Sequence, residues 1–277
     1  MKLAVEGWQT IHTLGEEKGI ALLKESGFDA VDYSFYWTDP SDNILGDDYL
    51  DRAHKTKELL DKYDLVCNQT HAPFGAPFGK PMNVSDPLYA DIVRALEYSS
   101  IIGAKHMVVH GVKVPKGISE LEVNKQYYES FLPYIKQFGT KIAVENLAST
   151  LTTPERMNAL MEQLDPECFV ALVDVGHANH RHIAPESFIR RVLPGRLQGL
   201  HIHDNYGQID DHILPYMGTI QWKYVLEALA EVDYTGDFTM ELPGFLPKYG
   251  KDMLPEALAF AAGVGRKMIE QFETLKG

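Results

Sequence analysis

Four ionisable residues directly follow, or end, short apolar stretches in the second half of the chain. They are Glu145 in AVENL, Asp174 in LVDVGH, His203 in GLHIHDN and Glu241 in FTMELP. A carboxylate at the end of a buried strand is unfavourable unless it is paired or binds a cation, and three carboxylates around one imidazole repel one another. A divalent ion removes that repulsion. The pattern therefore predicts a metal site with these four residues as ligands.

The types of these residues narrow the choice of ion. Three carboxylates with a single imidazole suit Mn²⁺, Mg²⁺, Co²⁺ or Zn²⁺, and the sequence does not choose among them by donor type alone. We expect one divalent ion, with Mn²⁺ preferred. Taken singly, each of these side chains is also typical of a hydrogen-bonded cap at a strand end, so the prediction depends on the four occurring together.

Four further histidines occur at the same level of the predicted strands. They are His71 in THAPF, His110 in VVHG, His177 in DVGH and His212 in IDDHILPYMG. A lone histidine is usually packed or held in a turn, but four at one level indicate a substrate pocket. His201 shares a strand with His203 and points to the same side, because side chains alternate with period two. We expect His201 to lie deeper and to serve packing, and we interpret His106, His180 and His182 as structural or surface residues.

Aromatic side chains are the other candidates for the pocket. Trp8 follows the first apolar stretch, and Tyr33, Phe35 and Trp37 flank the second. Their flat faces can stack on a sugar ring, although packing in the core is the alternative for each. Trp8 is the aromatic residue that we predict to bind substrate.

The elements that position these residues alternate along the whole chain. Short runs rich in Val, Ile, Phe and Tyr are followed by longer stretches with helical spacing, which is typical of βα units. Strands are predicted at Leu3–Trp8, Ala30–Phe35, Leu65–Thr70, His106–His110, Lys141–Glu145, Phe169–Asp174, Leu197–His203 and Phe238–Glu241. Helices are predicted at Leu14–Ser26, Asp47–Tyr63, Pro87–Ile102, Ser119–Phe138, Pro154–Leu164, Pro185–Val192, Gln221–Glu231 and Leu254–Thr274.

Eight such units without a Ser- or Gly-rich linker predict one α/β domain over residues 1–277, a single (β/α)8 TIM barrel. Two Rossmann-like halves are the alternative. The sequence has no GxGxxG between a predicted strand and helix and no GxxxxGK[ST] phosphate loop, which favours the barrel.

Composition excludes several classes of protein. The chain is 45% hydrophobic and 23% charged, with a net charge of −13, which disfavours attraction to nucleic acid or to an anionic membrane. Neither a signal-like apolar stretch near the N-terminus nor a run long enough to span a membrane is present in the sequence. Cys67 and Cys168 form no CxxC motif, which favours a reducing compartment. We expect a cytoplasmic protein with no nucleic-acid or membrane partner.

The motifs HAPF, VVHG, AVENL, DVGHAN, HIHDN, DDHxLPxxG and MELP, in this order, resemble the xylose-isomerase-like barrel superfamily of sugar isomerases, epimerases and endonuclease IV. The resemblance extends from the third predicted strand to the eighth. It implies a metal-dependent sugar isomerase or epimerase, in which Glu145, Asp174, His203 and Glu241 hold the ion and His177 holds a substrate oxygen. It also implies that Glu145 and Glu241 transfer a proton on opposite faces of a ketose, oxo-sugar or polyol derivative.

Three alternative functions stay open at this point. One is an oxo-sugar lyase similar to inosose dehydratase or to C-glycoside deglycosidases. Another is a non-catalytic barrel that binds sugar. The third is an abasic-site DNA repair enzyme resembling endonuclease IV, whose three-zinc site uses nine ligands of types found here at His71, His110, Glu145, Asp174, His177, His203, Asp210, His212 and Glu241.

The DNA-repair alternative is disfavoured by the glycine in DVGH, by the short connection from His203 to Asp210, by LPYMG after His212 and by the negative charge. The expected partner is a small carbohydrate, and a homo-oligomer or a partner subunit is compatible with the sequence.

Overall fold

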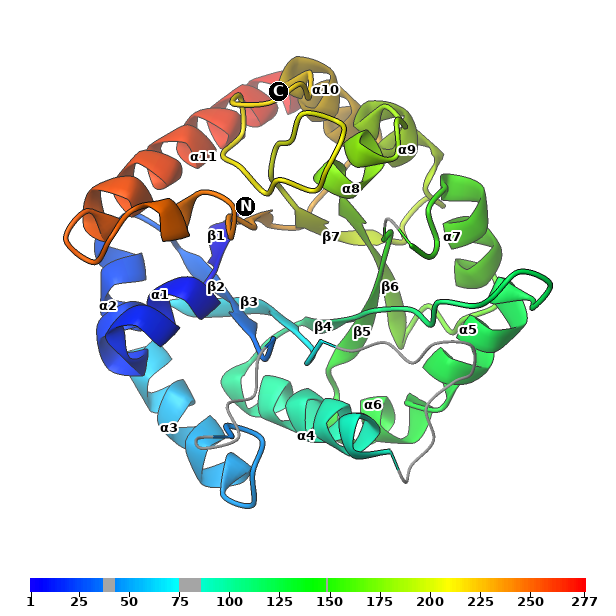
Figure 1. The fold of residues 1–277 in the computed structure, drawn as a ribbon, viewed down its shortest axis with the longest axis horizontal. Coiled ribbons are helices and arrows are strands. Elements are labelled where there is room, and N and C mark those ends of the chain that lie inside the picture. Colours follow the sequence, from blue (N-terminus) through cyan, green and yellow to red (C-terminus); the bar gives the residue numbers. More distant parts are fainter. Residues whose placement is uncertain (37–42, 75–85, 148) are drawn as a thin grey trace.

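The computed structural model describes residues 1–36, 43–74, 86–147 and 149–277. Eight parallel strands form one sheet in the order β7-β6-β5-β4-β3-β2-β1-β8, which curls into a nearly closed barrel surrounded by helices (Figure 1). This arrangement confirms the predicted (β/α)8 fold. The strands are β1 (Leu3–Glu6), β2 (Ala30–Ser34), β3 (Val66–His71), β4 (His106–Val109), β5 (Lys141–Glu145), β6 (Phe169–Asp174), β7 (Leu197–His201) and β8 (Phe238–Met240).

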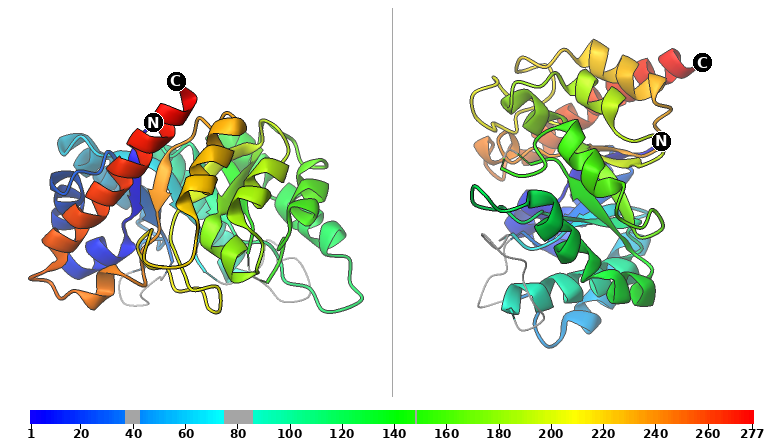
Figure 2. Two further views of the ribbon diagram at one scale, coloured as in Figure 1. Left: turned by 90° about the horizontal axis from the view of Figure 1, so that it is seen from above. Right: turned by 90° about the vertical axis from the view of Figure 1, so that its right-hand side faces the viewer.

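The helices cover the outside of the sheet (Figures 1 and 2). They are α1 (Trp8–Leu14), α2 (Glu16–Glu25), α3 (Tyr49–Lys62), α4 (Pro87–Ile102), α5 (Glu120–Glu129), α6 (Leu132–Phe138), α7 (Pro154–Met161), α8 (Val175–His180), α9 (Pro185–Arg191), α10 (Trp222–Glu231) and α11 (Leu254–Lys276), with a 3₁₀ turn η1 at Leu246–Lys248. Among the described residues, no helix has both the length and the apolar character that crossing a membrane requires.

Two of the predicted helices differ from those in the structure. The first, predicted at Leu14–Ser26, corresponds to α2, and an unpredicted helix, α1, precedes it; Gly15, whose φ of +84° is a conformation that favours glycine, separates the two. The fourth is interrupted between Glu129 and Leu132, because Pro133 lacks an amide hydrogen and lies in the first turn of a new helix, α6. The short helix α8, which follows Asp174 directly and includes His180, was not predicted.

Side chains alternate between the interior of the barrel and the layer beneath the helices. Val108, Ala143, Val170 and Leu172 form a small apolar cluster of their own, whereas a larger cluster joins the strands to the helices. On β5 and β6 the same alternation that turns Ala143 and Leu172 inward turns Glu145 and Asp174 inward at the strand ends. The fold therefore places the carboxylates of Glu145 and Asp174 above this small apolar cluster.

One strand pair is joined less completely than the others. The other neighbouring strands pair over two or more residues, with register shifts between Val31 and Asp32 on β2 and between Ala171 and Leu172 on β6. In the described part of the chain, β7 and β8 share a single bridge, Ile202↔Met240. Two backbone bonds support it, from Ile202 N to Thr239 O at 2.8 Å and from Glu241 N to Ile202 O at 3.1 Å. The barrel closes at this seam.

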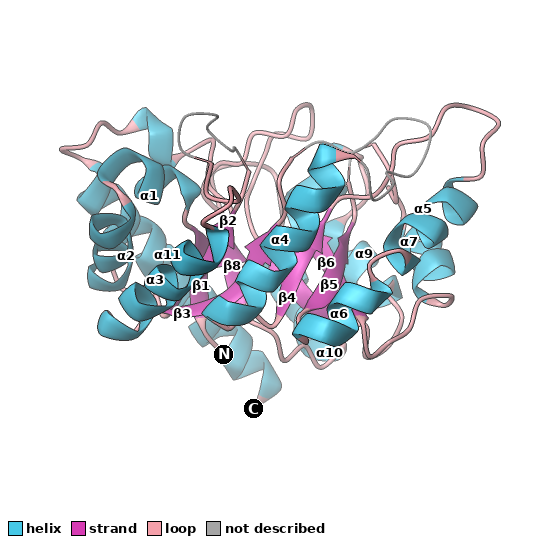
Figure 3. Ribbon diagram, turned by 90° about the horizontal axis from the view of Figure 1, so that it is seen from below, coloured by secondary structure: helices cyan, strands magenta, loops and turns pink. Residues whose placement is uncertain are grey.

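The two ends of the barrel differ. Figure 3 shows long loops gathered at one end, which the strands enter at their C-terminal residues, and both chain termini at the other. In TIM barrels the C-terminal end carries the functional residues. The candidate site must therefore be sought among the side chains that end the strands.

Candidate metal centre and active site

The four predicted metal ligands all lie at the C-terminal end of the barrel. Glu145 ends β5 and Asp174 ends β6, while His203 and Glu241 lie just beyond the last residues of β7 and β8. Each is buried, with no more than 5% of its surface exposed. The structure thus brings the four strand ends together as the sequence indicated.

Asp174 connects two of the predicted site histidines. Its carboxylate lies 3.0 Å from Nε2 of His203, and its Oδ1 accepts a 2.7 Å hydrogen bond from the backbone N–H of His177. The second contact caps the N-terminus of α8, a favourable place for a negative charge. His177 Nδ1 also lies 2.8 Å from the carbonyl oxygen of Asn146, which fixes the orientation of its ring.

Glu145 lies among four histidines, one of which is His177, with Nδ1 3.7 Å from Oε1. Its Oε1 is 2.9 Å from His201 Nδ1, and its Oε2 is 3.1 Å from His110 Nε2 and 3.9 Å from His71 Nε2. His71 and His110 contact each other through Nε2 atoms 3.0 Å apart. Two of the predicted substrate-binding histidines therefore share one face of this carboxylate.

A second group of histidines surrounds Asp210. Its Oδ2 lies 2.9 Å from His177 Nε2 and 3.0 Å from His212 Nε2, and its Oδ1 is 3.8 Å from His203 Nε2. The rings of His203 and His212 stack with centroids 3.7 Å apart. The chain segment that carries Asp210 and His212 is held by Asp204, whose side chain accepts hydrogen bonds from Tyr216 N, Ile220 N and Trp222 Nε1.

The donor atoms suit a divalent cation. Within the described ranges, four sets of donor atoms have all members within 4.8 Å of one another: His71–His110–Glu145, Glu145–Asp174–His177, Asp174–His201–Glu241 and His177–His203–Asp210–His212. Glu145 Oε2, His203 Nδ1, Asp210 Oδ1 and His212 Nδ1 are buried and make no hydrogen bond. Buried donors without partners are costly unless a cation or a ligand satisfies them. The predicted ligands Glu145, Asp174, His203 and Glu241 are distributed over these overlapping sets.

The imidazoles and carboxylates of the site shift each other's pKa values. Burial lowers the pKa of His201 and His177, but neighbouring carboxylates outweigh it and raise both well above the usual value. The pKa of His212 is likewise raised, to about 9, by Glu241 and Asp210 in spite of burial. Burial also opposes ionisation of Glu145, yet His201 holds the pKa of that carboxyl well below its ordinary value.

His71 differs from these histidines. Burial, together with the neighbouring His110, lowers the pKa of His71 to about 3. Its imidazole is therefore neutral at physiological pH, which is the form that binds a metal ion.

Several residues of the site were not predicted. Tyr36 donates its hydroxyl hydrogen to Glu241, and Glu6 at the end of β1 is almost fully buried, with a pKa that burial raises to about 8. Asp32, on β2, lies 3.2 Å from Nε2 of His201. Glu6 ends an apolar stretch just as Glu145 does, so the same signal would have found it.

His201 lies inside the barrel, as predicted, and His106, which was interpreted as a structural or surface residue, is buried. His201 is fully buried, but it is an ion-paired residue rather than a merely packed one. His106 begins β4 and lies at the opposite end of the strands.

Trp8 and Tyr33, two of the candidate aromatic residues, do not contact the site histidines in the described part of the structure. Trp8 begins α1 instead of ending a strand, stacks on His12 with centroids 4.8 Å apart, and lines a pocket of about 300 Å³ to which none of the predicted ligands contributes. Tyr33 donates to Glu16 in the layer beneath the helices, and Trp37 lies outside the described residues. Tyr36 and Phe74, stacked at 4.2 Å, are the aromatic rings next to His71.

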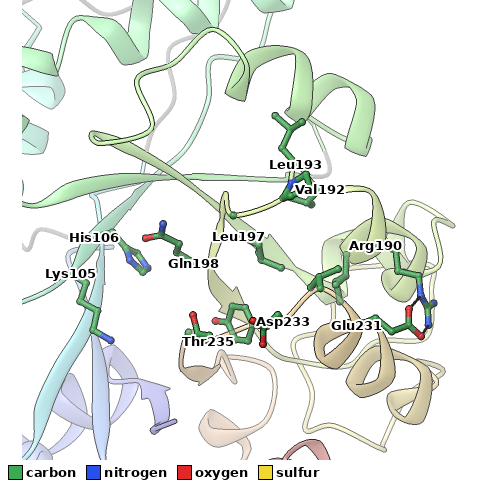
Figure 4. A pocket seen from close by; sticks show the side chains of 16 residues that line it. Lys105, His106, Arg190, Val192, Leu193, Leu197, Gln198, Glu231, Asp233 and Thr235 are labelled. Atoms are coloured by element: carbon green, nitrogen blue, oxygen red, sulfur yellow. Dashed lines mark hydrogen bonds and ion pairs between the residues drawn. The ribbon is translucent and has the colours of Figure 1, made fainter. Parts of the chain in front are cut away.

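The cavity of about 690 Å³ drawn in Figure 4 is at the other end of the barrel. It is lined by residues at or near the N-terminal ends of strands, such as His106 and Leu197, and by the Arg190–Glu231 ion pair. None of the carboxylates at the C-terminal strand ends lines it. We therefore assign the candidate site to the C-terminal end, where the unpartnered donors lie.

The chain is similar to known proteins both in sequence and in structure. The sequence model of a family described as xylose isomerase-like TIM barrel matches residues 20–262. The chain is 24% identical to the 2-oxo-tetronate isomerase of Haemophilus influenzae over 204 residues, which are 66% of this chain and 75% of that protein. A D-tagatose 3-epimerase-like protein superposes with a TM-score of 0.76 at 22% identity, covering 100% of this chain and 98% of the other. The IOLI protein, solved with a zinc atom bound, superposes with a TM-score of 0.70 at 16% identity over 99% of both chains.

Proposed function

The chain belongs to the xylose isomerase-like TIM barrel family, and we propose that it is a metal-dependent isomerase or epimerase of a ketose, oxo-sugar or polyol derivative. The observation that carries the proposal is the convergence of Glu145, Asp174, His203 and Glu241 at one end of the barrel. We propose these four as the ligands of one divalent ion, with Mn²⁺ preferred and Mg²⁺, Co²⁺ or Zn²⁺ as alternatives. The names of the similar proteins, an isomerase and an epimerase-like protein, support the same class.

The chemistry follows from the residues. A divalent ion in this site would stabilise the negative charge that develops on a substrate carbonyl oxygen when the adjacent carbon loses its proton. Glu145 and Glu241 come from β5 and β8, and each is held by a different partner, His201 and Tyr36 respectively. In the proposed mechanism one carboxylate removes the proton and the other returns it from the opposite face, which inverts the carbon. His71, His110, His177 and His212 supply hydrogen bonds to substrate oxygens.

The experiment uses a panel of ketoses and oxo-sugars with the Mn²⁺-loaded protein in heavy water, followed by NMR. We expect deuterium to enter at the carbon next to the carbonyl of the accepted sugar. Glu145→Gln and Glu241→Gln should each reduce this exchange by about a hundredfold or more, because each removes a proton-transferring group. Glu231→Gln, at an exposed carboxylate paired with Arg190, is the matched control and should exchange normally.

Other outcomes distinguish the alternatives. Full exchange in both site variants would exclude the two-carboxylate mechanism. Loss of water from the sugar would indicate a lyase, as in inosose dehydratase, and saturable binding without exchange would indicate a non-catalytic sugar-binding barrel.

A second candidate function is favoured by one specific observation. All nine residues that resemble the ligands of a three-zinc endonuclease fall within the four sets of donor atoms, so the site has room for more than one ion. Elemental analysis of the purified protein tests this point. About one ion per chain supports the isomerase or epimerase, whereas three zinc ions together with salt-sensitive incision of an abasic duplex would support the endonuclease.

A further inference from the structure

A column of hydrogen-bonded polar side chains runs through the barrel interior below Glu145, alongside the apolar cluster of Val108, Ala143, Val170 and Leu172. His201 is at its centre, with Nδ1 2.9 Å from Oε1 of Glu145 and Nε2 3.2 Å from Oδ2 of Asp32. Gln69 donates a 2.8 Å hydrogen bond to the same oxygen of Asp32, and its amide nitrogen is 3.0 Å from Nε2 of His201. At its lower end the column reaches His106, whose Nε2 lies 3.3 Å from Oε1 of Gln69 and whose side chain lines the cavity of Figure 4.

These polar residues occupy positions that apolar side chains fill elsewhere in the same barrel. Val108, Ala143, Val170 and Leu172 form the apolar part of the interior. Asp32 is completely buried, and its Oδ1 makes no hydrogen bond. A buried ion pair of this kind costs more to desolvate than a well-packed apolar side chain. Packing alone does not account for His201 and Asp32.

The two carboxylate oxygens of Glu145 have different neighbours. Oε1 is bound to His201, whereas Oε2 is buried without a hydrogen bond and faces His110 and His71. The other side of the imidazole is held by Asp32 and Gln69, so the ring cannot turn away without breaking both contacts. One oxygen is therefore held by His201, and the other faces the histidines at the C-terminal ends of β3 and β4.

We propose that His201, held by Asp32 and Gln69, is a positioning residue that fixes the carboxylate of Glu145 so that its second oxygen is available to the metal ion and the substrate. This inference rests on the proposed function, in which Glu145 is a metal ligand and a base. It assigns to His201 a role that acts through Glu145 rather than on the substrate itself.

Three substitutions of His201 separate this role from simple packing. In His201→Asn the side-chain amide nitrogen can take the place of Nδ1, which faces Glu145, whereas in His201→Gln it reaches the place of Nε2, which faces Asp32. We expect His201→Gln and His201→Leu to lower the affinity for Mn²⁺ alone about tenfold to a hundredfold, as is typical when the partner of a metal ligand is removed. His201→Asn should stay within about threefold of the unmodified protein, because the contact with the ligand is preserved.

The affinity is measured by calorimetric titration of the full chain with Mn²⁺, and melting temperatures confirm that each variant is folded. Val170→Ala is the control for a loss of packing in the barrel interior, since Val170 belongs to the apolar cluster there. It should lower the melting temperature and leave the Mn²⁺ affinity unchanged. An equal loss of affinity in Val170→Ala and His201→Leu would overturn the positioning role.

A double-mutant cycle with Glu145→Gln separates this inference from the proposed function. We expect Glu145→Gln to weaken Mn²⁺ binding and the effect of His201→Leu to disappear in that background, since His201 acts through Glu145. If Glu145→Gln weakens binding but His201→Leu does not, the positioning role alone is wrong. If Glu145→Gln binds Mn²⁺ normally, the ligand role in the proposed function is wrong, and the positioning role with it.

Discussion

Gly176 lies directly against the imidazole of His203. A Cβ atom built on residue 176 would be 1.9 Å from Cε1 of His203 and 2.4 Å from both ring nitrogens. Side chains never approach that closely, so helix α8 can pass over His203 only because residue 176 is a glycine. The requirement is one of space, and it explains the glycine in DVGH that the sequence left without a role.

The first prediction concerns this contact. Gly176→Ala should displace the ring of His203 and weaken Mn²⁺ binding about tenfold or more, since a metal site depends on the placement of each ligand. Calorimetric titration measures the affinity. The control is Gly263→Ala on α11, where an added Cβ meets nothing within 4 Å and alanine is the better helix former. Normal Mn²⁺ affinity in Gly176→Ala would show that His203 is not a ligand.

The second prediction is that metal binding releases protons. Without an ion, the pKa of His212 is about 9 because Glu241 and Asp210 outweigh the effect of burial, so at pH 7 this histidine carries a proton. A dication among the same carboxylates removes that stabilisation, and the apparent Mn²⁺ affinity should rise between about pH 6 and pH 9. Titrations at pH 7 in two buffers of different ionisation enthalpy count the protons. A heat that is the same in both buffers would contradict the coupling.

The third prediction concerns Glu6. Burial raises the pKa of Glu6 from 4.5 to about 8 in the folded protein, so the folded state binds the proton more tightly than the unfolded chain. The free energy of unfolding should therefore fall as the pH rises from about 4.5 to about 8, and Glu6→Gln should remove this loss. In chelator-treated protein we expect the variant to match the unmodified chain near pH 4.5 and to be more stable by roughly 5 kcal/mol above pH 8, at about 1.4 kcal/mol per pKa unit. Urea denaturation across this pH range measures the difference, and a constant difference would disprove the assignment.

The fourth prediction concerns the connection after β7. The carboxylate of Asp204 accepts hydrogen bonds of 2.9–3.2 Å from four donors: the backbone N–H groups of Asn205, Tyr216 and Ile220 and the indole N–H of Trp222. Asp204→Ala leaves these buried donors unpaired and should lower the free energy of unfolding by about 3 kcal/mol. Asp211→Ala, which removes one bond to Tyr206 N, is the control and should cost less than about 1 kcal/mol. Equal losses in the two variants would refute the role of Asp204.

Much of the fold was predictable because its signals are local. The bounds of α4, β5 and β6 agree with the sequence prediction, since proline at a helix start, glycine at a helix end and apolar runs act within a few residues. Helix α1 was missed because Trp8 follows the first apolar stretch directly and was assigned to its strand. The division near Pro133 was missed because the segments on both sides of it have helical spacing.

The site was predictable only in part, for a physical reason. A carboxylate at the end of an apolar strand stands out in sequence, so Glu145, Asp174 and Glu241 were found. The partners of these residues depend on how distant strands meet: Asp32 and His201 are 169 positions apart, and Tyr36 and Glu241 are 205 apart. No local pattern marks such pairs, and period two predicted where His201 lies but not what it contacts.

A divalent ion at the proposed site would also link the two strands of the seam between β7 and β8. His203 follows one strand of the seam and Glu241 follows the other, and between them the barrel is joined by the bridge from Ile202 to Met240. An ion bound to both side chains would cross-link β7 and β8 where few backbone hydrogen bonds join them. Without metal, the two strands should then separate locally more often than other neighbouring strands, and binding of the ion should suppress this opening.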